Sequence, residues 1–173
     1  MKNGKLTHNE ILMLLLYADN CHSITGKTRI QKIVYLYEEE VHEKIGFNKK
    51  INASEPSLFG FYPHHFGPFS DNLLKYLEEL TAFNILKQEM TKDILDNNKL
   101  KQITKFTLTE IGQNYVKSKL LQHIDHFTMD ILSNFKINYN NMIYNDLLYY
   151  VYNTYEIMTE KSLIKDQYLE SNK

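Results

Sequence analysis

Apolar and polar residues follow one another with the period of an amphipathic helix in several long stretches of the chain. The first covers about 8–19 and follows Thr7-His8-Asn9-Glu10, a capping box in which a hydroxyl and a carboxylate satisfy the first amides of a helix. The second runs from about 28 to 44, begins with the similar tetrad Thr28-Arg29-Ile30-Gln31, and places Glu38–Glu40 near its polar face. Because a cap and a period near 3.6 coincide twice, both stretches are predicted to be helices.

The next stretch, 45–69, is loop-rich, since it holds all three prolines and three of the six glycines. Leucines at helical spacing then predict a helix over about 69–84. Two strand-like pieces follow, at about 85–90 and 102–107, and a polar connection with turn residues joins them. This pattern predicts a β-hairpin directly after the helix.

A third capping box, Thr107-Leu108-Thr109-Glu110, predicts a long helix that carries apolar residues as far as Phe127. Two further helices are expected at about 142–155 and 160–170. The chain therefore ends in helices, and no internal repeat interrupts this order.

The order helix, helix, loop, helix, hairpin, helix is that of a winged helix-turn-helix, with 69–84 as the recognition-type helix and 85–107 as the wing. We therefore predict a mainly α fold with a winged helix-turn-helix-like core, one β-hairpin wing and a C-terminal helical extension. The winged-helix-like domain is expected over 1–135 and the helical extension over 136–173. The two are expected to pack as a single globular unit.

Composition narrows the class of protein. Apolar residues make up 43% of the chain, which is enough for a core and too many for a disordered segment. No run of 18 apolar residues is present, so no membrane-spanning helix is expected. The only cysteine, Cys21, excludes an internal disulfide and indicates a reducing, cytoplasmic location.

The charge pattern weighs against a simple DNA-binding surface. Lysine and arginine number 20 against 21 acidic residues, and the balance is even along the chain. The helix expected at 69–84 exposes one lysine against three acidic residues, whereas phosphate contacts need the opposite sign. The wing carries five lysines against three acidic residues, so it is the better candidate. Candidate DNA contacts on the wing and on the second helix are Lys27, Arg29, Lys32, Lys99 and Lys101.

The segment 61–70, FYPHHFGPFS, surrounds two histidines with aromatic rings. Adjacent histidines point in different directions, and the spacing identifies no further ligand, so a metal site is not expected. No nucleophile or oriented carboxylate is identifiable near them, so a catalytic site is not expected either. A structural role is expected for Gly67, Pro68 and Ser70, either with Gly67 and Pro68 opening a helix or with Ser70 as its N-cap.

The rings of the same segment would either pin the loop onto the core or form the rim of a contact surface. The candidate partner-binding residues are Tyr62, His64, His65, Phe66 and Phe69. A second histidine pair, His123 and His126, has metal-ligand spacing on the long helix, but no other ligand is marked and a solvated helix face is the preferred interpretation.

Four stretches combine these features in a fixed order: TRIQKIVYLYEEE (28–40), FYPHHFGPFSDNLLKYLEEL (61–80), FTLTEIG (106–112) and LLYYVYNTYEIMTEKS (147–162). Together they resemble the prokaryotic YwgA-like proteins and, more distantly, the Panacea-domain, SocA-like antitoxins. This resemblance implies a helical, winged-helix-like protein without known catalysis. Panacea domains are associated with toxin–antitoxin and phage-defence loci, where they neutralise toxins by binding them. One departure is that Glu156 stands where a proline commonly follows the tyrosine of the last motif.

We therefore expect a non-enzymatic module that binds a partner protein, such as a toxin or a defence protein, in an antitoxin, adaptor or phage-defence role. The alternative is a winged-helix transcriptional regulator, in which a homodimer would combine two basic patches on DNA. No catalytic residue, cofactor, metal ion or membrane is expected in either function.

Overall fold

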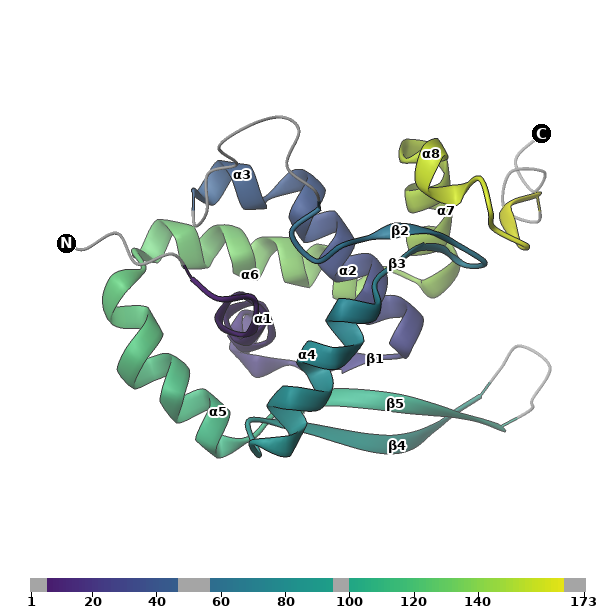
Figure 1. The fold of residues 1–173 in the computed structure, drawn as a ribbon. Coiled ribbons are helices and arrows are strands. Elements are labelled where there is room, and N and C mark those ends of the chain that lie inside the picture. Colours follow the sequence, from purple (N-terminus) through teal and green to yellow (C-terminus); the bar gives the residue numbers. More distant parts are fainter. Residues whose placement is uncertain (1–5, 47–56, 95–99, 167–173) are drawn as a thin grey trace.

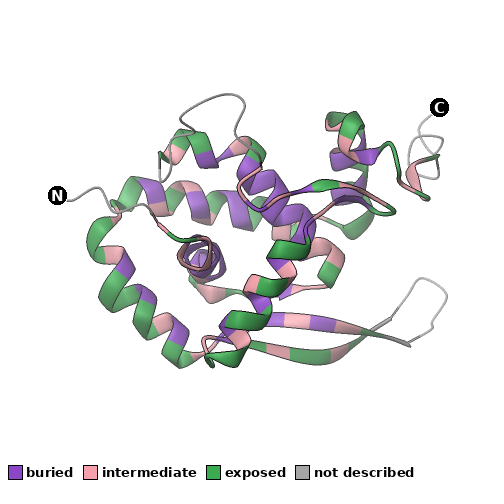
Figure 2. Ribbon diagram, viewed as in Figure 1, coloured by how far each residue is buried: buried purple, intermediate pink, exposed green. Residues whose placement is uncertain are grey.

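Helix α1 (His8–Tyr17) lies at the centre of the molecule (Figure 1). The computed structural model describes residues 6–46, 57–94 and 100–166, with the side chains of 93–94 and 100–101 left out. The expected capping box is present, because Thr7 Oγ1 accepts from Glu10 N and the Glu10 carboxylate accepts from Thr7 N. The residues Ile11–Leu16 are buried all round the helix, since α4, α6, the α5 region and β5 surround it. Figure 2 shows this burial as purple on α1 and along α2.

Helix α2 (Lys27–Glu40) begins one residue earlier than expected and without a capping box. Its N-cap is Gly26, which has a φ of 105°, and Thr28 lies inside the helix, so the second predicted box is wrong. The helix ends at Glu40, and a separate short helix, α3 (His42–Ile45), replaces its predicted last turn. Gln31, the supposed partner of the box, is buried and contacts another segment of the chain.

Three strands form an antiparallel sheet in the order β1 (Ile24–Thr25), β5 (Leu100–Leu108), β4 (Leu86–Ile94). The expected hairpin is thus confirmed, and each of its strands is longer than predicted. A second hairpin, β2 (Tyr62–His64) with β3 (Gly67–Phe69), lies in the stretch predicted as loop, so the expectation of a single hairpin is wrong.

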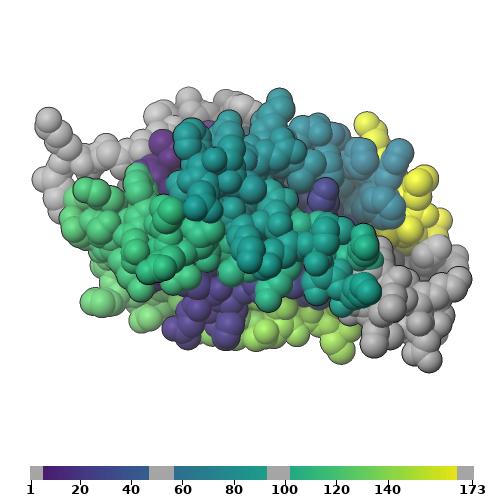
Figure 3. Space-filling model, turned by 90° about the horizontal axis from the view of Figure 1, so that it is seen from below, coloured from purple at the N-terminus to yellow at the C-terminus, as the bar shows by residue number. Residues whose placement is uncertain are grey.

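Helix α4 (Asp71–Ala82) joins the two hairpins. Its N-cap is Ser70, whose Oγ accepts from Leu73 N at 2.9 Å, so the second of the two predicted helix starts is confirmed. Figure 3 shows α4 and the β4–β5 hairpin, in teal, in the middle of one face of the molecule.

The long helix expected after the wing is divided in two. Helix α5 (Glu110–Tyr115) starts at the N-cap Thr109 and continues as the π-helix η2 (Val116–Leu120) and the 3-10 turn η3 (Leu121–His123). The backbone is then extended at Ile124, and α6 (His126–Asn141) starts at its own N-cap. His123 and His126 therefore lie on different elements, so their predicted helical pairing is wrong.

Two helices, α7 (Tyr144–Thr154) and α8 (Glu156–Thr159), follow α6 in the chain. Helix α7 agrees with the prediction at 142–155 and packs on α2, and α8 packs on the second hairpin. Residues 160–164 form turns and a connection, so the helix expected at 160–170 is wrong there; residues 165–166 are helical, and 167–170 lie outside the described residues. The expected domain boundary at 135/136 falls inside α6. Among the described residues, no helix is both long and apolar enough to span a membrane.

Candidate protein-interaction surface

The second hairpin holds all five residues predicted to bind a partner. Its register pairs Tyr62 with Phe69 and His64 with Gly67, so His65 and Phe66 form the tip. His64 stacks on Phe69 with ring centroids 4.8 Å apart, and the His65 ring lies 4.6 Å from that of His64. The structure therefore brings these rings together on one projecting hairpin.

The outer side of this hairpin is accessible. Phe66 exposes 49% of its surface and Tyr62 exposes 38%, whereas Phe69 is partly covered by the neighbouring rings. The Tyr62 hydroxyl donates to Asp71 Oδ2 at 2.8 Å, and this hydrogen bond raises the pKa of Tyr62. Tyr62 thus links the aromatic hairpin to the first turn of α4.

Leu163 extends this surface, although the sequence did not indicate it. Its amide donates to His65 O at 2.9 Å, and the Ser162 hydroxyl donates to the same carbonyl at 3.2 Å. Leu163 is 72% exposed, so it adds an apolar side chain beside the hairpin tip. The term hairpin surface denotes these six residues: Tyr62, His64, His65, Phe66, Phe69 and Leu163.

The inner side of the hairpin is fixed by polar residues of α2. Lys32 Nζ donates to Pro68 O at 2.8 Å, and the Gln31 side chain both accepts from Ser70 N and donates to Ser70 O, each at 2.9 Å. Ser70 Oγ also donates to Phe59 O. These contacts are buried, so they fix the position of β3 relative to the core.

Gly67 meets two independent constraints at the start of the same strand, beside the hairpin tip. Its φ is 79°, in the region that favours glycine, and an added Cβ would lie 2.8 Å from Tyr152 Cε1. The structural role predicted for Gly67, Pro68 and Ser70 therefore rests on backbone conformation, close packing and a helix cap.

Helix α4 presents an acidic face beside the hairpin surface. Its exposed charged residues are Asp71, Lys75, Glu78 and Glu79, which gives one positive against three negative charges. Glu79 also accepts from Asn9 Nδ2 at 3.0 Å. The charge balance expected from the sequence is thus present on the exposed side of the folded helix.

The predicted DNA contacts do not form one basic patch in the described residues. Lys27 is exposed, but Lys32 is 1% exposed, so its prediction as a DNA contact is wrong. Arg29 donates from Nη1 to the carbonyls of Tyr139, Asn140 and Met142 at 2.8–3.2 Å, where it stabilises the C-terminal end of α6. Lys99 and the side chain of Lys101 lie outside the described residues.

Two glutamates predicted near the polar face of α2 also hold distant segments. Glu38 is buried and accepts from Ser57 Oγ, Leu58 N and Phe59 N, so its predicted position near the polar face is wrong. Glu40 accepts from the hydroxyls of three tyrosines: Tyr139, Tyr150 and Tyr155. Burial and this carboxylate raise the pKa of Tyr139 and Tyr155. The polar residues of the TRIQKIVYLYEEE motif are therefore largely structural.

Comparison of the chain with protein-family models, curated proteins and solved structures gave no match. The resemblance to YwgA-like and Panacea-domain proteins consequently stays a prediction.

Proposed function

We propose that the protein is a non-enzymatic, winged-helix-like module that binds a partner protein through the hairpin surface and the acidic face of α4. The observation that carries this proposal is the position of α4. In the order of elements it stands where a winged helix has its recognition helix, yet it exposes three acidic residues and lies beside an accessible aromatic hairpin. Phosphate backbones repel such a face, whereas exposed aromatic rings are enriched in protein interfaces.

The topology supports the winged-helix part of the proposal. The elements α1, β1, α2, α4, β4 and β5 follow in the order of that fold, and the sheet order β1-β5-β4 places the short first strand beside the last. The hairpin β2–β3 is an insertion between the second helix and the recognition-type helix. It therefore adds a surface next to the one that DNA-binding members of this architecture use.

The partner that fits these surfaces has an apolar site for Phe66 and Leu163 and a basic rim opposite α4. Complementary charge of this kind steers association and excludes partners of the wrong sign. The resemblance noted above suggests a toxin or a phage-defence protein, which the module would restrain by binding.

Site-specific photo-crosslinking tests this proposal. A photoreactive phenylalanine analogue at Phe66 is expected to crosslink a specific protein when the chain is co-expressed with its genomic neighbours. Phe127, which is 74% exposed at the start of α6, provides the matched control position. The double substitution Glu78→Lys with Glu79→Lys should weaken the crosslink at 66. Equal crosslinking at 66 and 127, or no effect of the charge reversal, contradicts the proposal.

DNA binding is the second candidate function, and the β4–β5 hairpin favours it. The hairpin carries Lys92 and Lys105 on described positions and projects from the sheet as a wing does. A gel-shift assay on the DNA upstream of the gene, with a salt titration, tests this function, since phosphate contacts weaken steeply with salt. Binding that survives Lys99→Glu with Lys101→Glu would refute the wing as the contact.

A further inference from the structure

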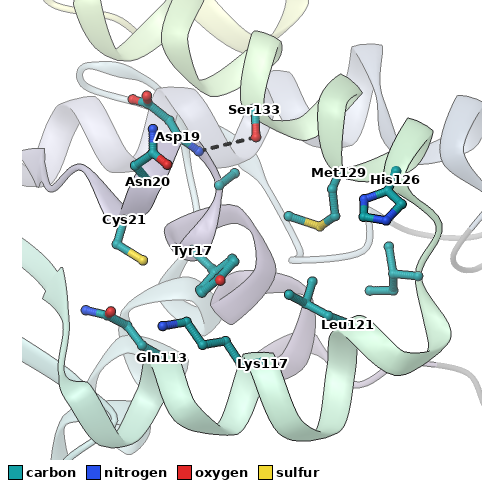
Figure 4. Close-up of a pocket in the computed structure, with 12 residues that line it drawn as sticks. Tyr17, Asp19, Asn20, Cys21, Gln113, Lys117, Leu121, His126, Met129 and Ser133 are labelled. Atoms are coloured by element: carbon teal, nitrogen blue, oxygen red, sulfur yellow. Dashed lines mark hydrogen bonds between the residues drawn. The ribbon is translucent and has the colours of Figure 1, made fainter.

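A pocket lies between the turn after α1, the helical segment α5–η2–η3 and the first half of α6. Its volume is about 430 Å³, within the range of small-molecule sites. Tyr17, Cys21, Lys117 and Met129 are among the residues that line it (Figure 4). None of its lining residues belongs to the hairpin surface or to α4, so this pocket is separate from the proposed protein-interaction surface.

The two ends of the pocket differ in chemistry. Figure 4 shows Cys21, Gln113 and the Lys117 ammonium gathered at one end, with Leu121 and Met129 towards the other. Within the part of the chain that the structure describes, the Lys117 ammonium has no ion-pair or hydrogen-bond partner. The pocket therefore combines an available cation with an apolar wall.

The turn on one side of the pocket has an unusual backbone that its neighbours hold in place. Asp19, Asn20 and Cys21 have φ values of 55°, 50° and 60°, so three consecutive residues other than glycine are left-handed. Asp19 N donates to Ser133 Oγ at 3.4 Å, and Asp19 Oδ1 lies 3.1 Å from His22 Nδ1. Strained turns of this kind cluster at ligand sites, where the surrounding structure determines them.

The opposite wall has a second irregularity. Lys117 lines the pocket from the π-helix η2, and the 3-10 turn η3 that follows it contributes Leu121. Single π-turns inside helices are frequently found at functional sites. The turn after α1 and this helix thus depart from regular geometry on the two sides of one pocket.

The charges around the pocket favour an anion. Lys117 faces it directly, and Lys136 lies behind the turn, where its ammonium donates to Leu16 O and Ala18 O. Burial raises the pKa of the Cys21 thiol, and the positive charges of Lys136 and Lys117 partly oppose this rise. The carboxylate of Asp19 is buried, and Figure 4 shows it turned away from Cys21 and Lys117. His126 is the remaining titratable group of the lining besides Tyr17 and Cys21.

We propose that this pocket binds a small organic anion with an apolar body, such as a medium-chain carboxylate or an alkyl phosphate. Lys117 pairs with the anionic group, Gln113 and Asn20 supply amide hydrogen bonds beside it, and Leu121 and Met129 contact the apolar body. Neutral or cationic molecules of the same length lack the partner for Lys117 and bind weakly.

Alkylation of Cys21 gives a direct measure of occupancy, because it is the only cysteine in the chain. Octanoate and octyl phosphate serve as the anionic probes, with octanol and octylammonium as neutral and cationic controls. At saturating anion, the rate of iodoacetamide labelling is expected to fall about fivefold or more, since the bound molecule lies against the thiol. The anion that protects at the lower concentration identifies the preferred headgroup. Equal protection by octanol and octylammonium, or no protection by either anion, overturns the proposal.

Reversing the charge of Lys117 on η2 tests whether this lysine pairs with the anionic group of the bound molecule. Lys117→Glu is expected to weaken binding of the protecting anion about fivefold or more in calorimetry, since a like-charge repulsion replaces an ion pair. Lys119→Glu is the matched control, because Lys119 is exposed on the same element but does not line the pocket. Binding that is equal in the two variants contradicts the role of Lys117, whereas a loss confined to Lys117→Glu supports it.

Discussion

Replacement of Lys32 by methionine should change how the stability of the fold depends on pH. Burial lowers the pKa of this lysine to about 7 in the folded chain, from 10.5 in an exposed lysine. Between these two values the unfolded chain binds a proton that the folded chain does not, so the free energy of unfolding rises with pH from about 7 to about 10. Below pH 7 both states bind the proton, and the dependence disappears.

The size of the effect follows from the two pKa values. Each pH unit inside this window adds about 1.4 kcal/mol per proton, so the wild type gains about 2 to 3 kcal/mol between pH 6 and pH 9. Lys32→Met loses this contribution and leaves Pro68 O without its donor, which costs about 1 to 3 kcal/mol. The free energy of unfolding of the variant, taken relative to that of the wild type, should therefore be highest at pH 6 and lowest at pH 9.

Urea unfolding followed by circular dichroism at pH 6, 7.5 and 9 measures this difference. Burial also lowers the pKa of Lys136, to about 8, but that lysine is present in both proteins and cancels in the comparison. If the difference in unfolding free energy between wild type and Lys32→Met is constant across these three pH values, Lys32 does not titrate in the expected window, and the reasoning is refuted.

Three further outcomes are expected from the packing. Gly67→Val should lower the melting temperature strongly, because Gly67 combines a positive φ with close contact to the core. The double substitution His64→Ala with His65→Ala should leave the melting temperature within a few degrees. Thermal melts in the reverse order would contradict this reasoning. Gly112→Ala should cost about 1 to 3 kcal/mol in urea unfolding, because its Cβ would meet the Ile85 carbonyl oxygen. Asp125→Ala should cost about 1 kcal/mol by removing the N-cap of α6, and Asp125→Asn should recover most of it.

Short sequence patterns correctly predicted the helices and strands that depend on residues close together in the chain. The capping box of α1, the leucine spacing of α4 and the paired strands of the β4–β5 hairpin all depend on residues within one turn or one strand, and each is present. The same kind of signal was misread at Thr28, where the tetrad has the form of a cap but the chain enters the helix at Gly26. A capping tetrad is short enough to occur by composition alone.

Contacts between distant segments could not be predicted in this way. Gln31 and Lys32 look like the polar side of an amphipathic helix, yet their partners at Ser70 and Pro68 lie 39 and 36 residues away. Buried polar side chains are tolerated only where such partners exist, and no periodicity reveals the partner. The break before α6 did have a local signal in the sequence, because Asp125 is a residue type that commonly caps helices and here accepts from Thr128 N. The regular apolar spacing on either side of Asp125 concealed this helix start.

The residues of the candidate sites also differ in whether the sequence could reveal them. The rings of the hairpin surface were evident because they are neighbours in the sequence. Leu163 was not, since a hydrogen bond to His65, 98 residues earlier in the chain, brings it there. The pocket beside Cys21 also combines residues of the turn after α1, the α5–η2–η3 segment and α6. A chemical site built from several segments becomes visible only in the folded chain.

The buried contacts of α2 give the hairpin surface its functional value. A hairpin of three-residue strands is marginal in water on its own, but here Lys32, Gln31 and the close packing of Gly67 fix strand β3 to the core. A partner that binds Phe66 therefore meets rings already held in place, and association loses less conformational freedom than binding to a mobile loop would. Lys32, which fails as a DNA contact because it is buried, thus helps Gln31 to preorganise the surface proposed to bind a protein.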